Sequence, residues 1–145
     1  MSTLSKDLPT LLFDTNVLMD CFTKRQPFDE AATHLINLVE LRHIKGFLCA
    51  SSVTNLYYLL QRYADKSFAE QKLSLVLELF AIAPVDKKVL VHANEIQAKD
   101  FEDAVIFCSA DAANVKAIVT RNIKDFKKSS IPVYTPTEAL NWVLS

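Results

Sequence analysis

Three aspartates in separate parts of the chain, Asp14, Asp103 and Asp125, have the surroundings expected of a metal centre. Asp14 ends an apolar run, where a charged group is costly to desolvate without a partner. Asp103 shares a helical face with Phe107 and Ala110, so it also needs a partner if that face is buried. Carboxylate oxygens suit Mg²⁺ or Mn²⁺, which relieves the repulsion between neighbouring acids. Such a centre can activate water and stabilise the charge of a phosphodiester displacement.

Each carboxylate also has a purely structural interpretation. Asp14 is placed to cap the helical turn that follows it through backbone N–H groups. Asp100 and Glu102 are typical of a helix start, where the helix dipole favours acids by about 0.3–1 kcal/mol each. Asp125 is consistent with a cap in a loop that begins with an Asx turn at Asn122. The metal interpretation therefore depends on whether the fold brings Asp14, Asp103 and Asp125 together.

Short apolar runs alternate with helical patterns along the whole chain. Strands are predicted over residues 11–14, 47–50, 81–85, 117–120 and 132–134. Helices are predicted over residues 16–22, 28–45, 51–63, 68–79, 86–96, 100–114 and 137–144. We expect Gly46 to end the second helix, and Ser51 or Ser52 to cap the third. This alternation predicts an α/β fold, a doubly wound parallel sheet of about five strands with helices on both faces.

In such a sheet the ligand site lies beyond the carboxyl ends of the strands. The segments that follow the predicted strands are 14–16, 51–55, Asp86 and 120–125. The helix near Asp100 opens toward the same end if its crossover is right-handed. We therefore expect Asp14, Asp103 and Asp125 to converge there.

Basic residues follow the acids along the chain. Residues 95–111 contain five acids and one base, whereas residues 116–128 contain five bases and one acid. An acidic centre beside a basic rim suits a phosphodiester substrate, with cations along its backbone. The residues predicted to make those contacts are Arg121, Lys124, Lys127 and Lys128. The alternative is a solvated loop with no ligand.

Composition limits the remaining possibilities. The chain has 145 residues, 50% of them hydrophobic, and we interpret residues 1–145 as one domain. One glycine is too few for a dinucleotide turn, a phosphate loop or a nucleophile elbow. The cysteines and histidines lack zinc spacing. We find no signal peptide and no membrane-length apolar run, so we expect a cytoplasmic protein without a membrane partner.

The segments LLFDTNVLMD, FEDAVIFCSA and AIVTRNIKDF, in this order and spacing, resemble the PIN-domain family, in particular its VapC-like toxin branch. The resemblance implies an Mg²⁺- or Mn²⁺-dependent endoribonuclease that cleaves single-stranded RNA, as the toxin of a toxin–antitoxin pair. It implies that Asp14 and Asp103 are metal ligands and that the segment around Asp125 supplies another. Asn16 corresponds to a polar helper and Thr120 to the Ser/Thr after the fourth strand. An antitoxin protein or a second copy of the chain would be a partner.

Two positions depart from the family pattern. Asn55 occupies the place of a family glutamate and can offer only a neutral carbonyl oxygen. Asn122 stands where many members have aspartate, which makes Asp125 the expected fourth acid. These changes leave open a module on the same fold that binds RNA or a protein without cutting. A dehalogenase-type phosphatase and a receiver domain fit less well, because their paired acids are missing.

Overall fold

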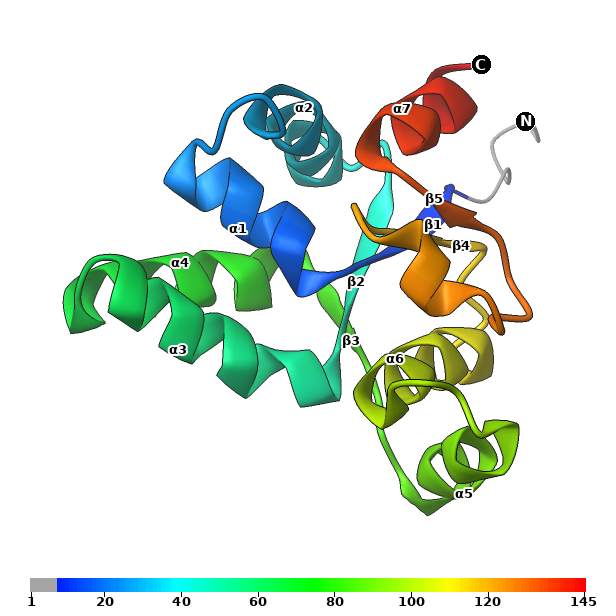
Figure 1. The fold of residues 1–145 in the computed structure, drawn as a ribbon. Helices are drawn as coiled ribbons and strands as arrows, with labels where there is room; N and C mark the ends of the chain where they lie inside the picture. The colour runs from blue at the N-terminus through cyan, green and yellow to red at the C-terminus, as the bar shows by residue number, and fades with distance from the viewer. Residues whose placement is uncertain (1–7) are drawn as a thin grey trace.

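The computed structural model describes residues 8–145, which form a five-stranded sheet and seven α-helices (Figure 1). All neighbouring strands are parallel, and their order is β3-β2-β1-β4-β5. The strands are β1 (Thr10–Phe13), β2 (Lys45–Cys49), β3 (Ala81–Ala83), β4 (Ala117–Val119) and β5 (Val133–Tyr134). The predicted parallel sheet of about five strands is confirmed, and each strand overlaps its predicted run.

β1 lies at the centre of the sheet and is buried on both faces. Leu11, Leu12 and Phe13 have no exposed surface. Leu12 pairs with Phe47 of β2 and with Ile118 of β4. Because successive side chains point to opposite faces, Leu11 and Phe13 join one core while Leu12 joins the other. This double burial explains why the run is apolar throughout.

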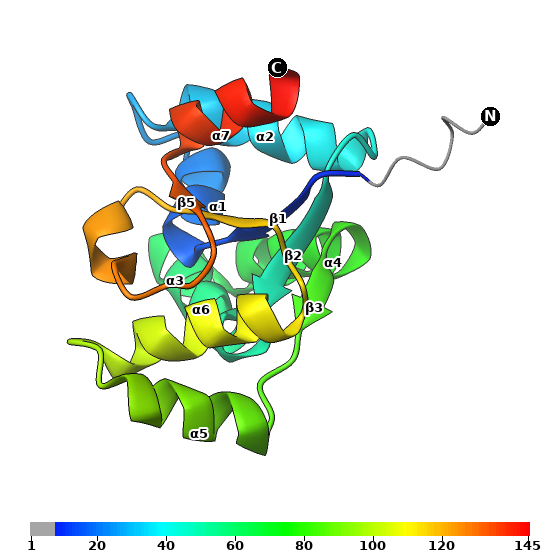
Figure 2. The same ribbon diagram turned by 90° about the vertical axis from the view of Figure 1, so that its right-hand side faces the viewer.

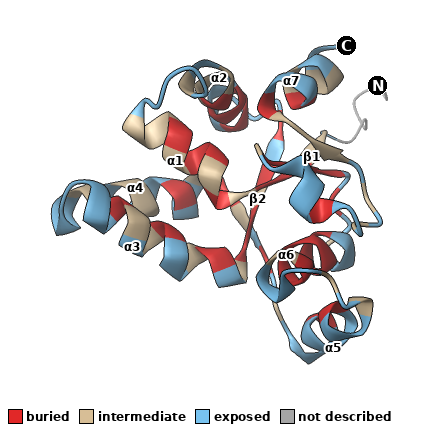
Figure 3. Ribbon diagram, in the orientation of Figure 1, coloured by how far each residue is buried: buried red, intermediate tan, exposed pale blue. Residues whose placement is uncertain are grey.

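Helices cover both faces of the sheet, as the two perpendicular views show (Figures 1 and 2). One core contains residues of α1 (Thr15–Thr23), α2 (Asp29–Glu40), α3 (Val53–Tyr63), α4 (Lys66–Leu79) and α7 (Pro136–Leu144). The other contains residues of α5 (Lys87–Ile96) and α6 (Phe101–Ala112). Buried residues follow the strands and the inward sides of these helices (Figure 3). The predicted two-faced architecture is confirmed.

The prediction that Gly46 ends a helix is wrong. α2 ends at Glu40, and Arg42 then takes a left-handed backbone conformation, with φ at 63°. Gly46 lies inside β2, where a Cβ atom would come within 2.8 Å of the Phe80 ring and 3.1 Å of Val39. Glycine is needed here for the close approach of these side chains to the strand backbone, and not for helix termination.

Side-chain caps begin two of the helices and are absent from the start of a third. Asp100 Oδ1 accepts the Asp103 N–H at 3.2 Å and starts α6, and Asp86 Oδ1 accepts the Val89 N–H at 3.0 Å and starts α5. The expected serine cap of α3 is not formed: Ser52 makes no side-chain cap bond, and a 3₁₀ turn over Ala50–Ser52 leads into the helix.

The strand order reverses beside β1. The chain adds β2 and β3 on one side of β1, and β4 and β5 on the other. The crevice expected of such a fold therefore lies at the carboxyl ends of β1 and β4, which are followed by Asp14 and Thr120. The Asp14 N–H donates to the Val119 carbonyl at 3.0 Å and ties the two strand ends together.

No helix within residues 8–145 is long and apolar enough to cross a membrane. Residues 1–7, which belong to the start where we expect no signal peptide, lie outside the described residues.

Candidate active site

Asp14 is both a helix cap and the centre of a polar network. Its Oδ1 accepts the Thr15 N–H at 2.9 Å, so the predicted cap of α1 is present. Its Oδ2 accepts the Thr120 hydroxyl at 2.8 Å and the Asn16 amide at 3.3 Å. The capping role and a catalytic role do not exclude each other, because a carboxylate has four lone-pair sites.

The neighbours of Asp14 are themselves held in place from the loop after β4. The Asn16 amide nitrogen also lies 3.3 Å from the Thr120 hydroxyl oxygen, and Asn16 Oδ1 accepts the Arg121 N–H at 3.3 Å. The Asn122 N–H donates to the Thr120 hydroxyl at 3.1 Å. Asn16 and Thr120 therefore fix one orientation of the Asp14 carboxylate.

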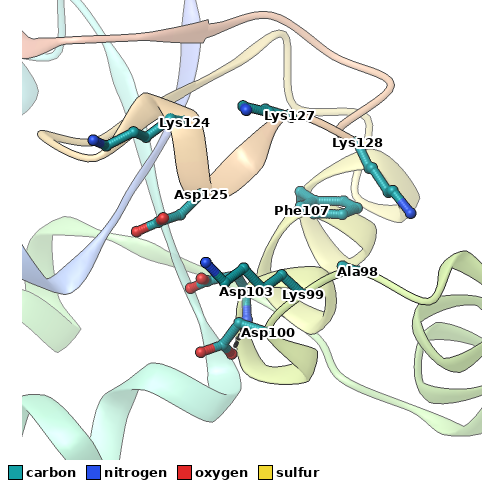
Figure 4. Close-up of a pocket in the computed structure, with 9 residues that line it drawn as sticks. All are labelled: Ala98, Lys99, Asp100, Asp103, Phe107, Lys124, Asp125, Lys127 and Lys128. Atoms are coloured by element: carbon teal, nitrogen blue, oxygen red, sulfur yellow. Dashed lines mark hydrogen bonds between the residues drawn. The ribbon is translucent and has the colours of Figure 1, made fainter.

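The second group of acids begins α6. Asp100 caps the helix, whereas Glu102 and Asp103 lie in its first turn. Asp103 is half-buried, and Asp100 and Glu102 are exposed. Asp125 lies in the 3₁₀ turn η3 (Ile123–Phe126), which packs against α6 through the Phe107 and Phe126 rings. Figure 4 shows the Asp103 and Asp125 carboxylates on the same side of a shared hollow.

The pKa values of Asp14 and Asp103 are raised, mainly by burial and in part by the negative charges of neighbouring carboxylates. Burial is the main cause that raises the pKa of Asp14, hydrogen bonds from Thr120 and Thr15 oppose it, and the charges of Glu102 and Asp125 add to the increase. Burial also raises the pKa of Asp103 to about 6, helped by the charges of Asp100, Asp14, Asp125 and Glu102. The structure therefore brings Asp14, Asp103 and Asp125 within electrostatic range at one end of the sheet.

The donor chemistry of this end fits a hard divalent cation. All of the donors are oxygens, and the repulsion among them is what a cation would relieve. Within residues 8–145, however, no three His, Cys, Asp or Glu side chains are grouped closely enough to hold one ion. The acids match the charge requirement of such a centre but not its ligand distances.

Lysines line the hollow beside the acids. The hollow has a volume of about 570 Å³, and its lining includes Lys99, Lys124, Lys127 and Lys128 (Figure 4). The Lys128 ammonium donates to the carbonyls of Ile96 at 3.4 Å and Gln97 at 3.2 Å. Lys124 and Lys127 are exposed and form no ion pair with another residue of the described chain. Of the predicted basic residues, these two have the freest ammonium groups, and Lys99 is a lysine that sequence reasoning did not include.

Arg121 lies elsewhere and is already paired. Its Nε donates to Asp20 Oδ2 at 2.6 Å and its Nη2 to Asp20 Oδ1 at 3.3 Å. Its guanidinium carbon lies 4.4 Å from the centre of the Phe28 ring. The Asp20 side chain is only 2% exposed, against 22% for Arg121. The predicted backbone-contact residue thus clamps the loop after β4 onto α1.

Sequence reasoning missed Asp20. The available signal was an acid four residues after Asn16, on the same helical face, and inside a segment, residues 17–22, that is otherwise apolar. Nothing in the local pattern identified its partner, because Arg121 is distant along the chain.

Asn55 faces a second hollow, on the other side of Asp14. This hollow has a volume of about 670 Å³, and its lining includes Asp14, Asn16, Asn55, Leu59 and Tyr63. Asn55 is exposed on the first turns of α3. The three predicted metal ligands therefore line two different hollows, with Asp14 on one and Asp103 and Asp125 on the other.

Comparison with solved structures identifies the same fold. A toxin–antitoxin complex from Klebsiella pneumoniae is 24% identical, with a TM-score of 0.65, covering 87% of this chain and 97% of that one. DNA-bound VapBC from Salmonella typhimurium is 17% identical, with a TM-score of 0.68, covering 90% and 99%. The sarcin–ricin-loop-cleaving toxin VapC20 of Mycobacterium tuberculosis is 14% identical, with a TM-score of 0.61, covering 74% and 86%.

A search of curated protein sequences finds no match to this chain. The sequence signature of the PIN domain, in contrast, matches residues 10–124. This region contains Asp14, Asp100, Glu102, Asp103 and four of the five strands, and it ends one residue before Asp125. The resemblance in the sequence is confirmed, and the chain belongs to the PIN domain family.

Proposed function

We propose that this chain is a divalent-metal-dependent endoribonuclease that cuts single-stranded RNA. The observation that supports the proposal most strongly is the group of mutually repelling carboxylates at the ends of β1 and β4, with lysines beside it. PIN domains typically are nucleases that use divalent metals, and membership of this family agrees with that chemistry.

In this proposal Asp14, Asp103 and Asp125 hold Mg²⁺ or Mn²⁺, and Glu102 and Asp100 add negative charge around them. A bound divalent ion supplies water activation and neutralises charge on the reacting phosphate. Asp14 has least freedom to move, because Thr120 and Asn16 orient its carboxylate.

The other predicted site residues either bind the RNA backbone or position the loop after β4. Lys124 and Lys127 are free to neutralise phosphates next to the cleaved bond, and Lys128 lies at the rim of the same hollow. Asn122 keeps the loop after β4 in place through its N–H bond to Thr120. Arg121 acts through its clamp on Asp20, so its contribution is to position the loop and not to bind phosphate.

The test is cleavage of an end-labelled single-stranded RNA by purified protein with Mn²⁺. We expect internal cuts from the native chain and none from Asp14→Asn or Asp103→Asn. The loss should exceed the ~10²–10⁴ of a single acid–base group, since a lost ligand removes water activation and charge neutralisation together.

Asp111→Asn is the matched control, because Asp111 is an exposed acid at the far end of α6. It should cut like the native chain. Unchanged cleavage by Asp14→Asn would show that a contaminant cuts the RNA, and no cleavage by the native chain would contradict the nuclease proposal.

The second candidate is a PIN module that binds RNA or protein without cutting. It is favoured by the absence, within residues 8–145, of three acids grouped around one ion position. The neutral amides at Asn55 and Asn122 point the same way. RNA binding with no cleavage at any Mn²⁺ concentration would select this function.

A toxin role and an antitoxin partner are the finer form of the nuclease proposal. They are supported by likeness to solved toxin–antitoxin complexes, some of them bound to DNA. The apolar side chains exposed on α3 and α4, among them Tyr58, Leu75 and Leu77, offer area for a partner or a second copy. Expression of the native chain in bacteria should arrest growth, and expression of Asp14→Asn should not.

A further inference from the structure

We propose that the hollow between α1 and α3 binds the base of a nucleotide next to the cleaved phosphodiester. This inference rests on the proposed function, because it places single-stranded RNA at Asp14. It assigns a different part of the RNA to each hollow. The hollow beside Asp103 holds the RNA backbone, and the hollow between α1 and α3 holds a base.

The α1–α3 hollow has the wall chemistry that a base requires. Its sides include the apolar parts of Met19, Leu59 and Tyr63, and its polar edge includes Asn16 and Asn55. Pockets that bind flat organic groups combine mainly apolar walls with a few polar groups that fix orientation. Since Asp14 lines the same hollow, a base held there belongs to a nucleotide beside the reacting phosphate.

Tyr63 is held as one wall of the hollow. Its hydroxyl donates to the Thr23 carbonyl at the end of α1, at 3.4 Å, and its ring centre lies 5.7 Å from that of Phe68. The side chain is still 57% exposed. An anchored and exposed aromatic ring is the feature on which unpaired bases stack in single-strand-binding proteins.

Asn55 supplies a group able to read a base edge. Its amide has both donors and an acceptor, and it forms no side-chain hydrogen bond with another residue of the range 8–145. Paired donor and acceptor groups of this kind distinguish one base from another. The amide thus provides recognition at a position where a carboxylate would repel the phosphates beside the base.

The charges favour a base over a phosphate in this hollow. Arg121 lines it, but its guanidinium is paired with the buried Asp20, and the other carboxylate present is Asp14. Arg25 is the remaining cation of the lining. The hollow beside Asp103 is lined by four lysines as well as three aspartates, so the RNA backbone is better placed there.

The test measures binding of fluorescent homopolymeric RNA 10-mers of A, C, G and U to the full chain in EDTA, where no cutting occurs. We expect the native chain to prefer one base. Asn55→Leu should reduce that preference by roughly tenfold, because the edge contact is lost. Tyr63→Ala should weaken binding of all four RNAs by about tenfold, with an unchanged salt dependence.

Two controls separate the hollows. Tyr58→Ala removes a tyrosine of α3 that is as exposed as Tyr63, at 61%, but does not line the hollow, and it should bind like the native chain. Lys127→Ala should reduce the slope of log affinity against log salt by about 1 and leave the base preference intact.

Unchanged base preference in Asn55→Leu, together with equal affinities of Tyr63→Ala and Tyr58→Ala, would overturn the inference. Loss of binding of a protein partner in the two hollow variants, with RNA binding unaffected, would also overturn it. Cleavage by the native chain in Mn²⁺ would then still support the nuclease proposal. Conversely, altered base preference without any cleavage in Mn²⁺ would retain the base site and reject the nuclease.

Discussion

The two groups of acids at the end of the sheet differ in how they are held. Both oxygens of Asp14 accept hydrogen bonds from neutral donors, whereas the carboxylates of Asp103 and Asp125 accept none from described residues. Asp14 lies between two central strands, and Asp125 lies in a short exposed turn. Asp14 is therefore preorganised, whereas no hydrogen bond from residues 8–145 holds the Asp103 and Asp125 carboxylates in one orientation.

In the proposed metal centre the acids would have to come closer together than they are here, because within residues 8–145 no three of them are grouped around one position. Burial is the main cause that raises the pKa of Asp103 to about 6, and the neighbouring negative charges add to it. Bringing the carboxylates closer together without a cation would increase that repulsion. In this proposal Asp103 and Asp125 stay apart from Asp14 until a bound ion offsets the repulsion among the three carboxylates. Loss of a contact that holds Asp14 in place should then destabilise the fold. Removal of the negative charge of Asp103 should stabilise it.

The largest effect is expected from Arg121→Ala, which breaks the ion pair between the loop after β4 and Asp20 of α1. It leaves the buried Asp20 carboxylate without its partner, and we expect the free energy of unfolding to fall by about 3 kcal/mol. Urea denaturation measures it. Arg62→Ala, an exposed arginine on α3, should change it by less than about 0.5 kcal/mol. Equal changes in unfolding free energy for the two variants would show that the ion pair of Arg121 with Asp20 does not stabilise the fold.

Thr120→Val tests directly whether the hydrogen bond from Thr120 holds Asp14 in place. The hydroxyl donates to Asp14 and accepts the Asn122 N–H, so its loss should cost roughly 2 kcal/mol of unfolding free energy. It should also raise the pKa of Asp14 further, because the bond from Thr120 lowers it. Urea denaturation and carboxyl chemical shifts followed against pH provide the two readouts. An unchanged Asp14 pKa would contradict the preorganisation argument.

Mn²⁺ should stabilise the native chain against heat. An ion bound only by the folded state adds about 1.4 kcal/mol at ten times its Kd, a rise in Tm of several degrees. Scanning calorimetry with Mn²⁺ and with an equal ionic strength of NaCl separates binding from screening. Asp103→Asn should show a much smaller rise, and an identical rise in both chains would remove Asp103 from the ligand set.

The smallest expected effect is an increase in the free energy of unfolding, whereas Arg121→Ala and Thr120→Val should lower it. The folded state holds a proton on Asp103 more tightly than the unfolded state does, because its pKa is raised from 3.8 to about 6. This contribution to stability is complete below pH 3.8 and is lost as pH rises through 6. Without metal, Asp103→Asn should therefore stabilise the fold at pH 7, by about 1 kcal/mol after allowance for solvent screening. Urea denaturation in EDTA at pH 4 and pH 7 checks this, and destabilisation at pH 7 would contradict the repulsion.

The alternation of apolar runs and helical patterns was enough to predict the parallel two-faced sheet. The local rule failed at Gly46, where glycine usually marks a helix end but here makes room for the Phe80 ring on β2. That requirement comes from a packing contact, which a reading of neighbouring residues does not contain.

The chain by itself determined the chemistry of the site. Asp14 follows an apolar strand and Asp100 to Asp103 start a helix, and parallel strands open at one edge, so the pattern alone predicts that these acids lie at the same end of the sheet. Only the tertiary structure decided the partners. Asp20 and Arg121 are far apart in sequence, and their pairing depends on β1 and β4 lying side by side. Burial and long-range contacts set the pKa of Asp103 and the separation of the two hollows, because both depend on distances between segments that local sequence does not encode.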